Sequence, residues 1–178
     1  MRDSFDREIR YLRISVTDRC NLRCVYCMPE EGVPWMPHER VVSFEAIRDT
    51  VAAAVGLGFD KFRLTGGEPL VRKGLPELVC MLRAVPGVGT LAMTTNGTLL
   101  APVALELKAR GLDSVNISLD TLDPERYAAL TRGGRLADAL AGIDAAIAAG
   151  FKVKLNAVVM EEDGERELER VRRYAAEK

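Results

Sequence analysis

The sequence predicts an α/β fold in which parallel strands alternate with helices. Short apolar segments of strand length alternate about five times with longer amphipathic segments, which is the pattern of parallel strands joined by right-handed crossovers. The later units repeat at very roughly 25–40 residues, which is typical of βα units and too irregular for a solenoid. With 178 residues, 48% of them apolar, the chain can form one domain with a substantial core.

Each unit can be placed along the chain. The expected strands cover residues 11–16, 62–65, 90–94, 114–118 and 153–159, and the expected helices cover residues 43–57, 75–84, 102–110, 136–149 and 165–178. Ser43 is a good N-cap for the first helix. In the fourth helix the aligned apolar residues are Leu140, Ile143 and Ile147. In the last, charged helix we expect Leu168, Val171 and Ala175 to face inward.

Composition excludes several classes of protein. A net charge of −1 does not suggest a nucleic-acid surface, and no apolar run is long enough to span a bilayer. Residues 1–6 are polar and lack the apolar stretch of a signal peptide, so we expect a cytoplasmic protein without membrane contact. Cysteines in a reducing cytosol more often serve metals or catalysis than disulfides. Cys80, among apolar neighbours, is expected to be a buried packing residue.

Three of the four cysteines, Cys20, Cys24 and Cys27, lie in the first βα connection, residues 17–42, which is far longer than such loops usually are. An iron–sulfur cube usually has four thiolate ligands, so three clustered thiolates would leave one iron open to a substrate or second cofactor. The alternative is structural zinc, with His38 of the same loop as fourth ligand.

Polar segments follow three further strands. They are Gly66-Gly67-Glu68-Pro69, Thr94-Thr95-Asn96-Gly97 and Asn116-Ile117-Ser118-Leu119-Asp120. In parallel βα folds the carboxyl ends of the strands share one edge, where the loops converge to form sites. One glycine pair alone would indicate only a turn. Three polar segments beside a cysteine loop predict a functional site at this edge.

These residues resemble the radical S-adenosylmethionine (radical SAM) superfamily, through the Cys-x3-Cys-x2-Cys loop with Tyr26 inside it and through Gly66-Gly67-Glu68. The resemblance covers essentially the whole chain. It implies a partial (β/α)6 TIM-like barrel with about five βα units present. Residues 10–17, 27–32 and 62–70 are similar to a narrower family, the GTP 3′,8-cyclases of molybdenum cofactor biosynthesis.

The resemblance implies a radical lyase reaction. Cys20, Cys24 and Cys27 would bind a 4Fe-4S cluster whose open iron is chelated by S-adenosylmethionine. One electron would cleave a C–S bond of the sulfonium to give a 5′-deoxyadenosyl radical. That radical would abstract hydrogen from C3′ of the GTP ribose, and the carbon radical would attack C8 of guanine. The cofactors carry the chemistry and the protein positions them.

Binding roles are carried over by position, and no side chain is assigned a catalytic role. For S-adenosylmethionine the resemblance points to Tyr26, Gly66, Gly67, Glu68 and Ser118. For GTP it points to Arg13, Arg63, Thr94 and Lys154, whose cations suit a triphosphate or guanine edge. Inside apolar strands, the charges of Arg13 and Lys154 are expected to be expensive unless a ligand pairs with them.

Plainer interpretations remain open. Glu68 could be a helix N-terminal carboxylate, Arg63 could pair with an acid at the rim of the core, and Lys154 could extend to solvent. The charges of the last helix, such as Glu169 and Arg173, are expected on a solvated face. The whole chain could also be a radical SAM enzyme for another substrate, or a non-catalytic zinc-stabilised module.

The chain differs from the cyclase family in extent. Residues 1–178 match the radical SAM core domain, while the family's C-terminal region, with a second three-cysteine 4Fe-4S cluster, has no counterpart here. We therefore expect a truncated form or one completed by a partner chain, which puts GTP binding and turnover by this chain alone in doubt. An unpaired edge at residues 153–159 and exposed apolar surface would favour homo-oligomers. The expected electron donor is a reductant protein or a flavodoxin-type protein.

Overall fold

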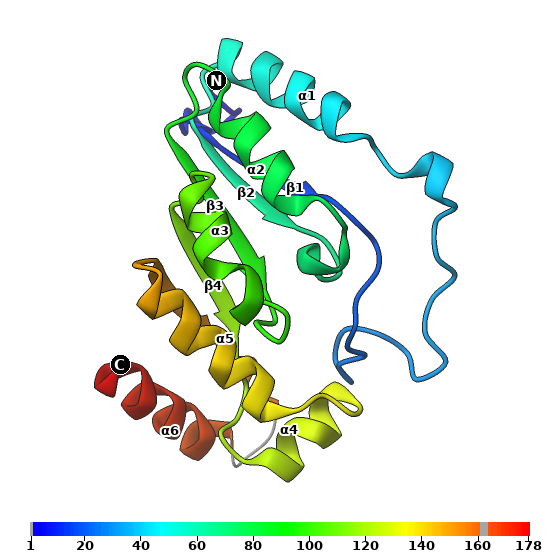
Figure 1. Cartoon of the computed structure of the whole chain (residues 1–178), viewed down its shortest axis with the longest axis vertical. Helices are drawn as coiled ribbons and strands as arrows, with labels where there is room; N and C mark the ends of the chain where they lie inside the picture. The colour runs from blue at the N-terminus through cyan, green and yellow to red at the C-terminus, as the bar shows by residue number, and fades with distance from the viewer. Residues whose placement is uncertain (1, 161–163) are drawn as a thin grey trace.

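In residues 2–160 and 164–178, which the computed structural model describes, five strands form one sheet (Figure 1). All neighbours pair in parallel and follow sequence order. The strands are β1 (Tyr11–Ser15), β2 (Lys61–Thr65), β3 (Thr90–Thr95), β4 (Ser114–Ser118) and β5 (Lys152–Asn156). The predicted α/β fold is confirmed, because each unit contributes one strand and returns through a helix.

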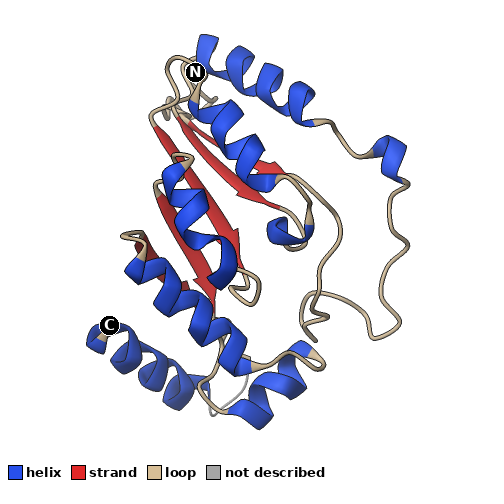
Figure 2. Ribbon diagram, in the orientation of Figure 1, coloured by secondary structure: helices blue, strands red, loops and turns tan. Residues whose placement is uncertain are grey.

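Helices and loops make the connections (Figure 2). The α-helices are α1 (Phe44–Gly56), α2 (Leu75–Arg83), α3 (Ala104–Ala109), α4 (Pro124–Thr131), α5 (Leu136–Ala148) and α6 (Gly164–Glu177). The 3₁₀ helices are η1 (His38–Arg40), η2 (Pro69–Val71) and η3 (Ala101–Val103). Ser43 is the N-cap of α1, as predicted, and its hydroxyl accepts a 3.2 Å hydrogen bond from the amide of Ala46.

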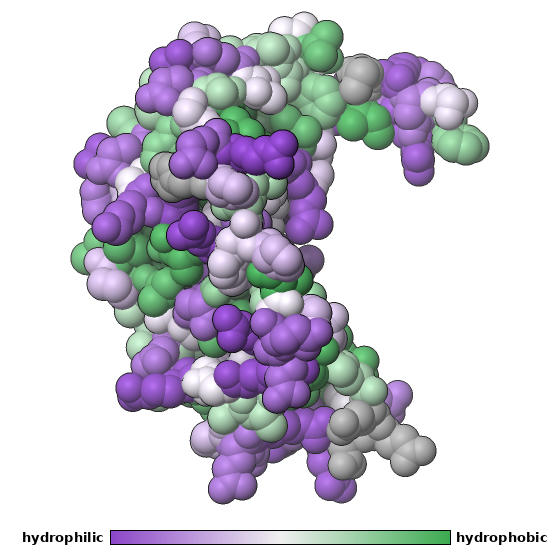
Figure 3. All heavy atoms as spheres, turned by 90° about the vertical axis from the view of Figure 1, so that its right-hand side faces the viewer, coloured by the Kyte–Doolittle hydropathy of each residue, from purple (hydrophilic) through white to green (hydrophobic). Residues whose placement is uncertain are grey.

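One face of the sheet packs against helices and the other is open. Side chains alternate along each strand, so every second residue enters the core beneath the helices. The buried set includes Phe62, Leu64, Leu91, Met93, Val115 and Ile117. We call the other side the open face; on it lie Arg13, Arg63, Thr94, Asn116, Ser118 and Lys154. The molecule has a C-shaped outline (Figure 3), as expected for a partial barrel.

Helix α4 was not predicted. It has 8 residues, begins after the N-cap Asp123 and buries only Tyr127 and Thr131. A short helix with so little apolar surface has no clear hydrophobic period. Its position nevertheless matters, because it lies next to the cysteine loop.

Several predicted burial positions are wrong. Cys80 is exposed, because the neighbouring Leu78 and Val79 occupy the inner face of α2. Ala175, expected to face inward on α6, is also exposed, and together with Ile147 of α5 it lines a groove beside β5. Helical spacing defines a stripe but not its width, which depends on what packs against it.

The predicted edge at residues 153–159 is confirmed in position but is shorter. Within the described residues β5 pairs with β4 alone and ends at Asn156. Val158, Val159 and Met160 follow it and are exposed. An apolar groove of about 260 Å³, lined in part by Phe151 and Tyr174, lies beside the strand. The expected exposed apolar surface is therefore present at this edge.

Candidate functional site

The cysteine loop begins as an extension of the sheet. The amide of Val16 donates to the Thr65 carbonyl at 2.9 Å, the amide of Gly67 donates to the Thr17 carbonyl at 2.9 Å, and the amide of Glu68 donates to the Arg19 carbonyl at 2.8 Å. These bonds continue the pairing of β1 and β2 beyond both strands. The backbone just before Cys20 is thereby fixed to the carboxyl edge of the sheet.

Gly66 and Gly67 permit this contact. A Cβ atom on Gly66 would lie 2.5 Å from the Thr17 carbonyl oxygen, and a Cβ on Gly67 would lie 2.3 Å from the Arg19 carbonyl oxygen. Such distances are shorter than any real contact of a Cβ. The resemblance assigns these two glycines to S-adenosylmethionine binding. The structure shows that the backbone of the cysteine loop itself requires them.

Glu68 is buried and held at both carboxylate oxygens. Its Oε1 accepts from the Thr95 hydroxyl at 2.7 Å and the Leu70 amide at 3.1 Å, and its Oε2 accepts from the Asn96 amide at 2.7 Å. Burial raises the pKa of Glu68, against the hydrogen bonds, which lower it. The N-terminal interpretation is confirmed, because Glu68 caps η2. In addition, it ties the end of β2 to the end of β3.

The second half of the cysteine loop contacts α4. The amide of Arg23 donates to the Thr131 carbonyl at 3.1 Å, and the amide of Val25 donates to the Leu130 carbonyl at 2.9 Å. These carbonyls belong to the last turn of α4, where helical partners are lacking. Leu22, directly before Arg23 in the chain, is buried.

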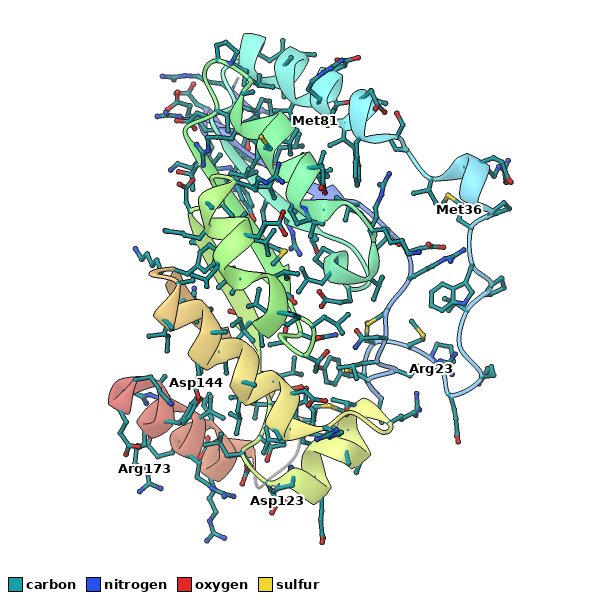
Figure 4. The ribbon with its side chains drawn as sticks, in the orientation of Figure 1. Arg23, Met36, Met81, Asp123, Asp144 and Arg173 are labelled. Carbon is teal, nitrogen blue, oxygen red and sulfur yellow. The ribbon has the colours of Figure 1, made fainter. Side chains whose placement is uncertain are left out.

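The three thiols are close enough to interact. Burial is the main cause that raises the pKa of Cys20 and of Cys24, and the neighbouring cysteines add to both shifts. Sulfur atoms gather beside Arg23 in Figure 4. In the described residues no three His, Cys, Asp or Glu side chains converge on a single metal ion. The ligands of an iron–sulfur cube, in contrast, bind different irons.

His38, the fourth ligand of the zinc alternative, has its side chain outside the described part of the structure. The zinc alternative therefore stays a prediction.

Tyr26 and Asn96 add polar contacts around the thiols. The Tyr26 hydroxyl donates to Asp120 Oδ2 at 2.6 Å, and burial together with this carboxylate raises the pKa of Tyr26. The Asn96 side-chain amide donates to Asn21 Oδ1 at 2.9 Å and lies 4.0 Å from Cys20 Sγ. Neither Asp120 nor Asn96 was singled out from the sequence, although both lie in the polar segments after the strands.

The residues expected to bind GTP share the open face. Strand register aligns Arg13 with Arg63, and Asn116 with Thr94 on one side and Lys154 on the other. Arg63 donates to the Tyr11 hydroxyl at 2.7 Å and contacts Thr94 Oγ1 at 3.4 Å, so the plainer interpretation of Arg63, an acidic partner at the rim of the core, is wrong.

Arg13 and Lys154 are exposed, which corrects the expectation that their charges are expensive. Lys154 does reach solvent, as the plainer interpretation held. The five strands carry five cations, Lys61 and Lys152 in addition to Arg13, Arg63 and Lys154, and contain no acidic residue. An anion is the natural partner for such a face. Ser118, at the end of β4, is half-buried on the same side.

A five-stranded parallel sheet, with three thiols at its carboxyl edge beside a cation-bearing face, defines an α/β protein of the partial-barrel type. The model of the radical SAM superfamily matches residues 14–175, and the chain belongs to that superfamily.

Among curated relatives, the GTP 3′,8-cyclase of Pelotomaculum thermopropionicum is 58% identical over 161 residues, 90% of this chain and 50% of that protein. The GTP 3′,8-cyclase of Pseudomonas entomophila is 48% identical over 177 residues, 99% and 53% of the two chains. The chain thus spans about half the length of the curated relatives it matches.

Solved structures share the fold. Native anSMEcpe with bound AdoMet and Kp18Cys peptide has a TM-score of 0.70 at 20% identity, and the match covers 94% of this chain and 48% of that one. Methylornithine synthase (PylB) has a TM-score of 0.73 at 19% identity, with 93% and 50% covered. At these identities the likeness concerns the fold alone.

Proposed function

We propose that the chain is the cluster- and S-adenosylmethionine-binding half of a GTP 3′,8-cyclase, acting in molybdenum cofactor biosynthesis. The observation that carries the proposal is the placement of the three-cysteine loop directly on Gly66 and Gly67, beside a strand face that has cations and no acids. The similarity to curated cyclases of about 50% identity or more supports the choice of GTP over other radical SAM substrates.

Cys20, Cys24 and Cys27 would hold a 4Fe-4S cluster, and Tyr26, Gly66, Gly67, Glu68 and Ser118 would surround S-adenosylmethionine. When bound, these groups supply a 5′-deoxyadenosyl radical on one-electron reduction. The chain's own contribution is placement. Glu68 is deeply buried, and within the described residues no cation pairs with it, so a ligand ammonium close to it would favour its charged form.

The open face would bind GTP. Arg13, Arg63 and Lys154 supply charge for phosphates or the guanine edge, and Thr94 supplies a hydroxyl. Arg63 is already oriented by Tyr11, so its guanidinium loses little freedom when an anion arrives.

The remaining expectations belong to this proposal. Residues 1–178 would form the radical SAM core domain of a larger assembly in the cytoplasm, reduced by a flavodoxin-type donor and completed by a second chain or copy. None of the helices in residues 2–160 and 164–178 is long and apolar enough to cross a membrane.

The test begins with anaerobic reconstitution using iron and sulfide. We expect a brown protein with about four irons per chain that yields 5′-deoxyadenosine from S-adenosylmethionine on reduction. GTP binding is then measured by calorimetry. Arg13→Ala and Lys154→Ala should each weaken it, whereas Arg48→Ala, which removes an exposed cation of α1 paired with Asp49, should not.

A colourless chain that takes up zinc would refute the cluster assignment. Cluster formation and S-adenosylmethionine cleavage, with equal loss of GTP binding in all three variants, would refute the GTP site on the open face and favour another radical SAM substrate.

A further inference from the structure

Arg132 is one of two non-glycine residues in the described part of the chain with a left-handed backbone, at φ 53° and ψ 59°. It ends α4 in a Schellman-type turn. Its amide donates to the Ala129 carbonyl at 3.3 Å, and the amide of Gly133 donates to the Ala128 carbonyl at 2.8 Å. Glycine is the usual residue at this position, because a Cβ strains the left-handed conformation. The sequence has glycines one and two residues later, yet the turn is made by an arginine.

The side chain of Arg132 explains why an arginine stands there. Its Nη1 donates to the Met28 carbonyl at 2.7 Å and to the Arg23 carbonyl at 3.2 Å. Those two carbonyls lie on either side of the segment that contains Cys24 and Cys27. One guanidinium nitrogen therefore joins the two ends of the segment that carries two of the three thiols.

Other contacts bring the same surface of α4 against the loop. Arg23 and Val25 donate their amides to the carbonyls of Thr131 and Leu130. A Cβ on Gly134 would lie 2.9 Å from Leu22 Cδ2, so the turn after α4 packs too closely against the cysteine loop for a side chain at residue 134. In Figure 4 the loop that carries Arg23 lies next to α4. Among the described residues of this turn, Arg132 is the only one whose side chain donates hydrogen bonds to carbonyls of the cysteine loop.

We propose that Arg132 is a positioning residue for the cluster, and that its strained backbone is kept because the guanidinium holds the Cys24–Cys27 segment in a ligand-competent shape. The inference rests on the proposed cluster. Strain at a position where glycine would be easier indicates a requirement for the side chain. Partners behind metal ligands typically change metal affinity by 10- to 100-fold when removed.

Arg132→Asn is the informative variant. Asparagine accepts the left-handed conformation more readily than most residues but is too short to reach both carbonyls. The melting temperature of the metal-free protein should stay equal or rise. Loss of iron from the reconstituted protein to a chelator should become on the order of tenfold faster. Amide hydrogen exchange in residues 22–28 of the metal-free protein should also accelerate.

Two further variants serve as controls. Asp6→Asn changes the other left-handed residue, remote in sequence from the cysteines, and should leave iron loss unchanged. Arg132→Lys keeps a cation with several donors and should restore part of the slow release.

Iron loss and exchange at the parent rate in Arg132→Asn would overturn the inference. So would a large fall in melting temperature with faster exchange throughout the chain, because Arg132 would then serve folding and not the loop. If the parent takes up no cluster, the proposed function fails, while the exchange measurement on the metal-free chain still tests whether Arg132 orders the loop.

Discussion

The hydroxyl of Tyr26 donates a 2.6 Å hydrogen bond to Asp120, across 94 residues of sequence. The same carboxylate accepts from the amide of Val158 at 2.8 Å. Asp120 thus connects the cysteine loop, the end of β4 and the segment after β5. It holds Tyr26, the residue between two thiols, against the carboxyl edge of the sheet.

A double-mutant cycle measures this bond. Tyr26→Phe and Asp120→Ala should each destabilise the fold, and the pair should show a coupling of about 1 kcal/mol in urea unfolding. Asp120→Ala should cost more alone, because it also leaves the Val158 amide without its acceptor. Tyr174→Phe is the matched control, since the buried Tyr174 hydroxyl has no hydrogen-bond partner in the described structure. Additive effects of the two changes would show that the bond does not form in solution.

Cysteine replacement tests the ligand assignment. Cys24→Ala should abolish iron uptake on reconstitution, because two thiolates do not retain a cluster that normally has three or four. Cys80→Ala should take up iron like the parent, since Cys80 is exposed on α2, outside the cysteine loop. Iron and sulfide analysis with the visible absorption spectrum gives the answer. Equal iron in the Cys24 variant and the parent would contradict the assignment.

Two glycine-to-alanine changes should shift the free energy of unfolding in opposite directions. Gly67→Ala places a Cβ 2.3 Å from the Arg19 carbonyl, so we expect a loss of at least about 2 kcal/mol and weaker binding of both cluster and S-adenosylmethionine. Gly56→Ala, in α1, meets no atom within 4 Å and should stabilise by up to about 1 kcal/mol. Thermal and urea unfolding compare the two. A Gly67 variant as stable as the parent would mean that the loop does not rest on β2.

Glu167 should make stability depend on pH. The Thr121 hydroxyl, at 2.6 Å, and the Arg170 guanidinium, at 2.7 Å, lower its pKa below the ordinary value. A carboxyl with a lowered folded pKa stabilises the fold above its unfolded pKa of about 4.3, and this contribution disappears as pH falls through the folded pKa.

Glu167→Gln should therefore cost about 1–2 kcal/mol at pH 7, with the difference from the parent shrinking below about pH 4. Urea unfolding at several pH values measures it. Glu169→Gln, with an exposed ion pair to Arg172, should change stability by less than about 0.5 kcal/mol at any of these pH values. A cost for Glu167→Gln that is the same at pH 7 and pH 3.5 would contradict the role of the ionised carboxylate.

The strand and helix order could be read from local pattern because each element is short and contacts its sequence neighbours. The predicted strand at 114–118 matches β4, and the predicted helix at 43–57 differs from α1 by its two caps. Helix α4 was missed because the contacts that stabilise it come from a distant part of the sequence. Its last carbonyls and Arg132 are satisfied by the cysteine loop, more than 100 residues earlier in the chain.

By itself the sequence determined the alternation of strands and helices, the three-thiol loop and the cationic strands, since these depend on residue type and spacing along the chain. Only the tertiary structure decided three contacts. The backbone of the cysteine loop lies against Gly67, the Tyr26 hydroxyl donates to Asp120, and the Arg132 guanidinium donates to the carbonyls of Arg23 and Met28. The reason is physical. Hydrogen-bond partners and steric clearances between segments far apart in the chain exist only once the sheet has brought the strand ends to one edge.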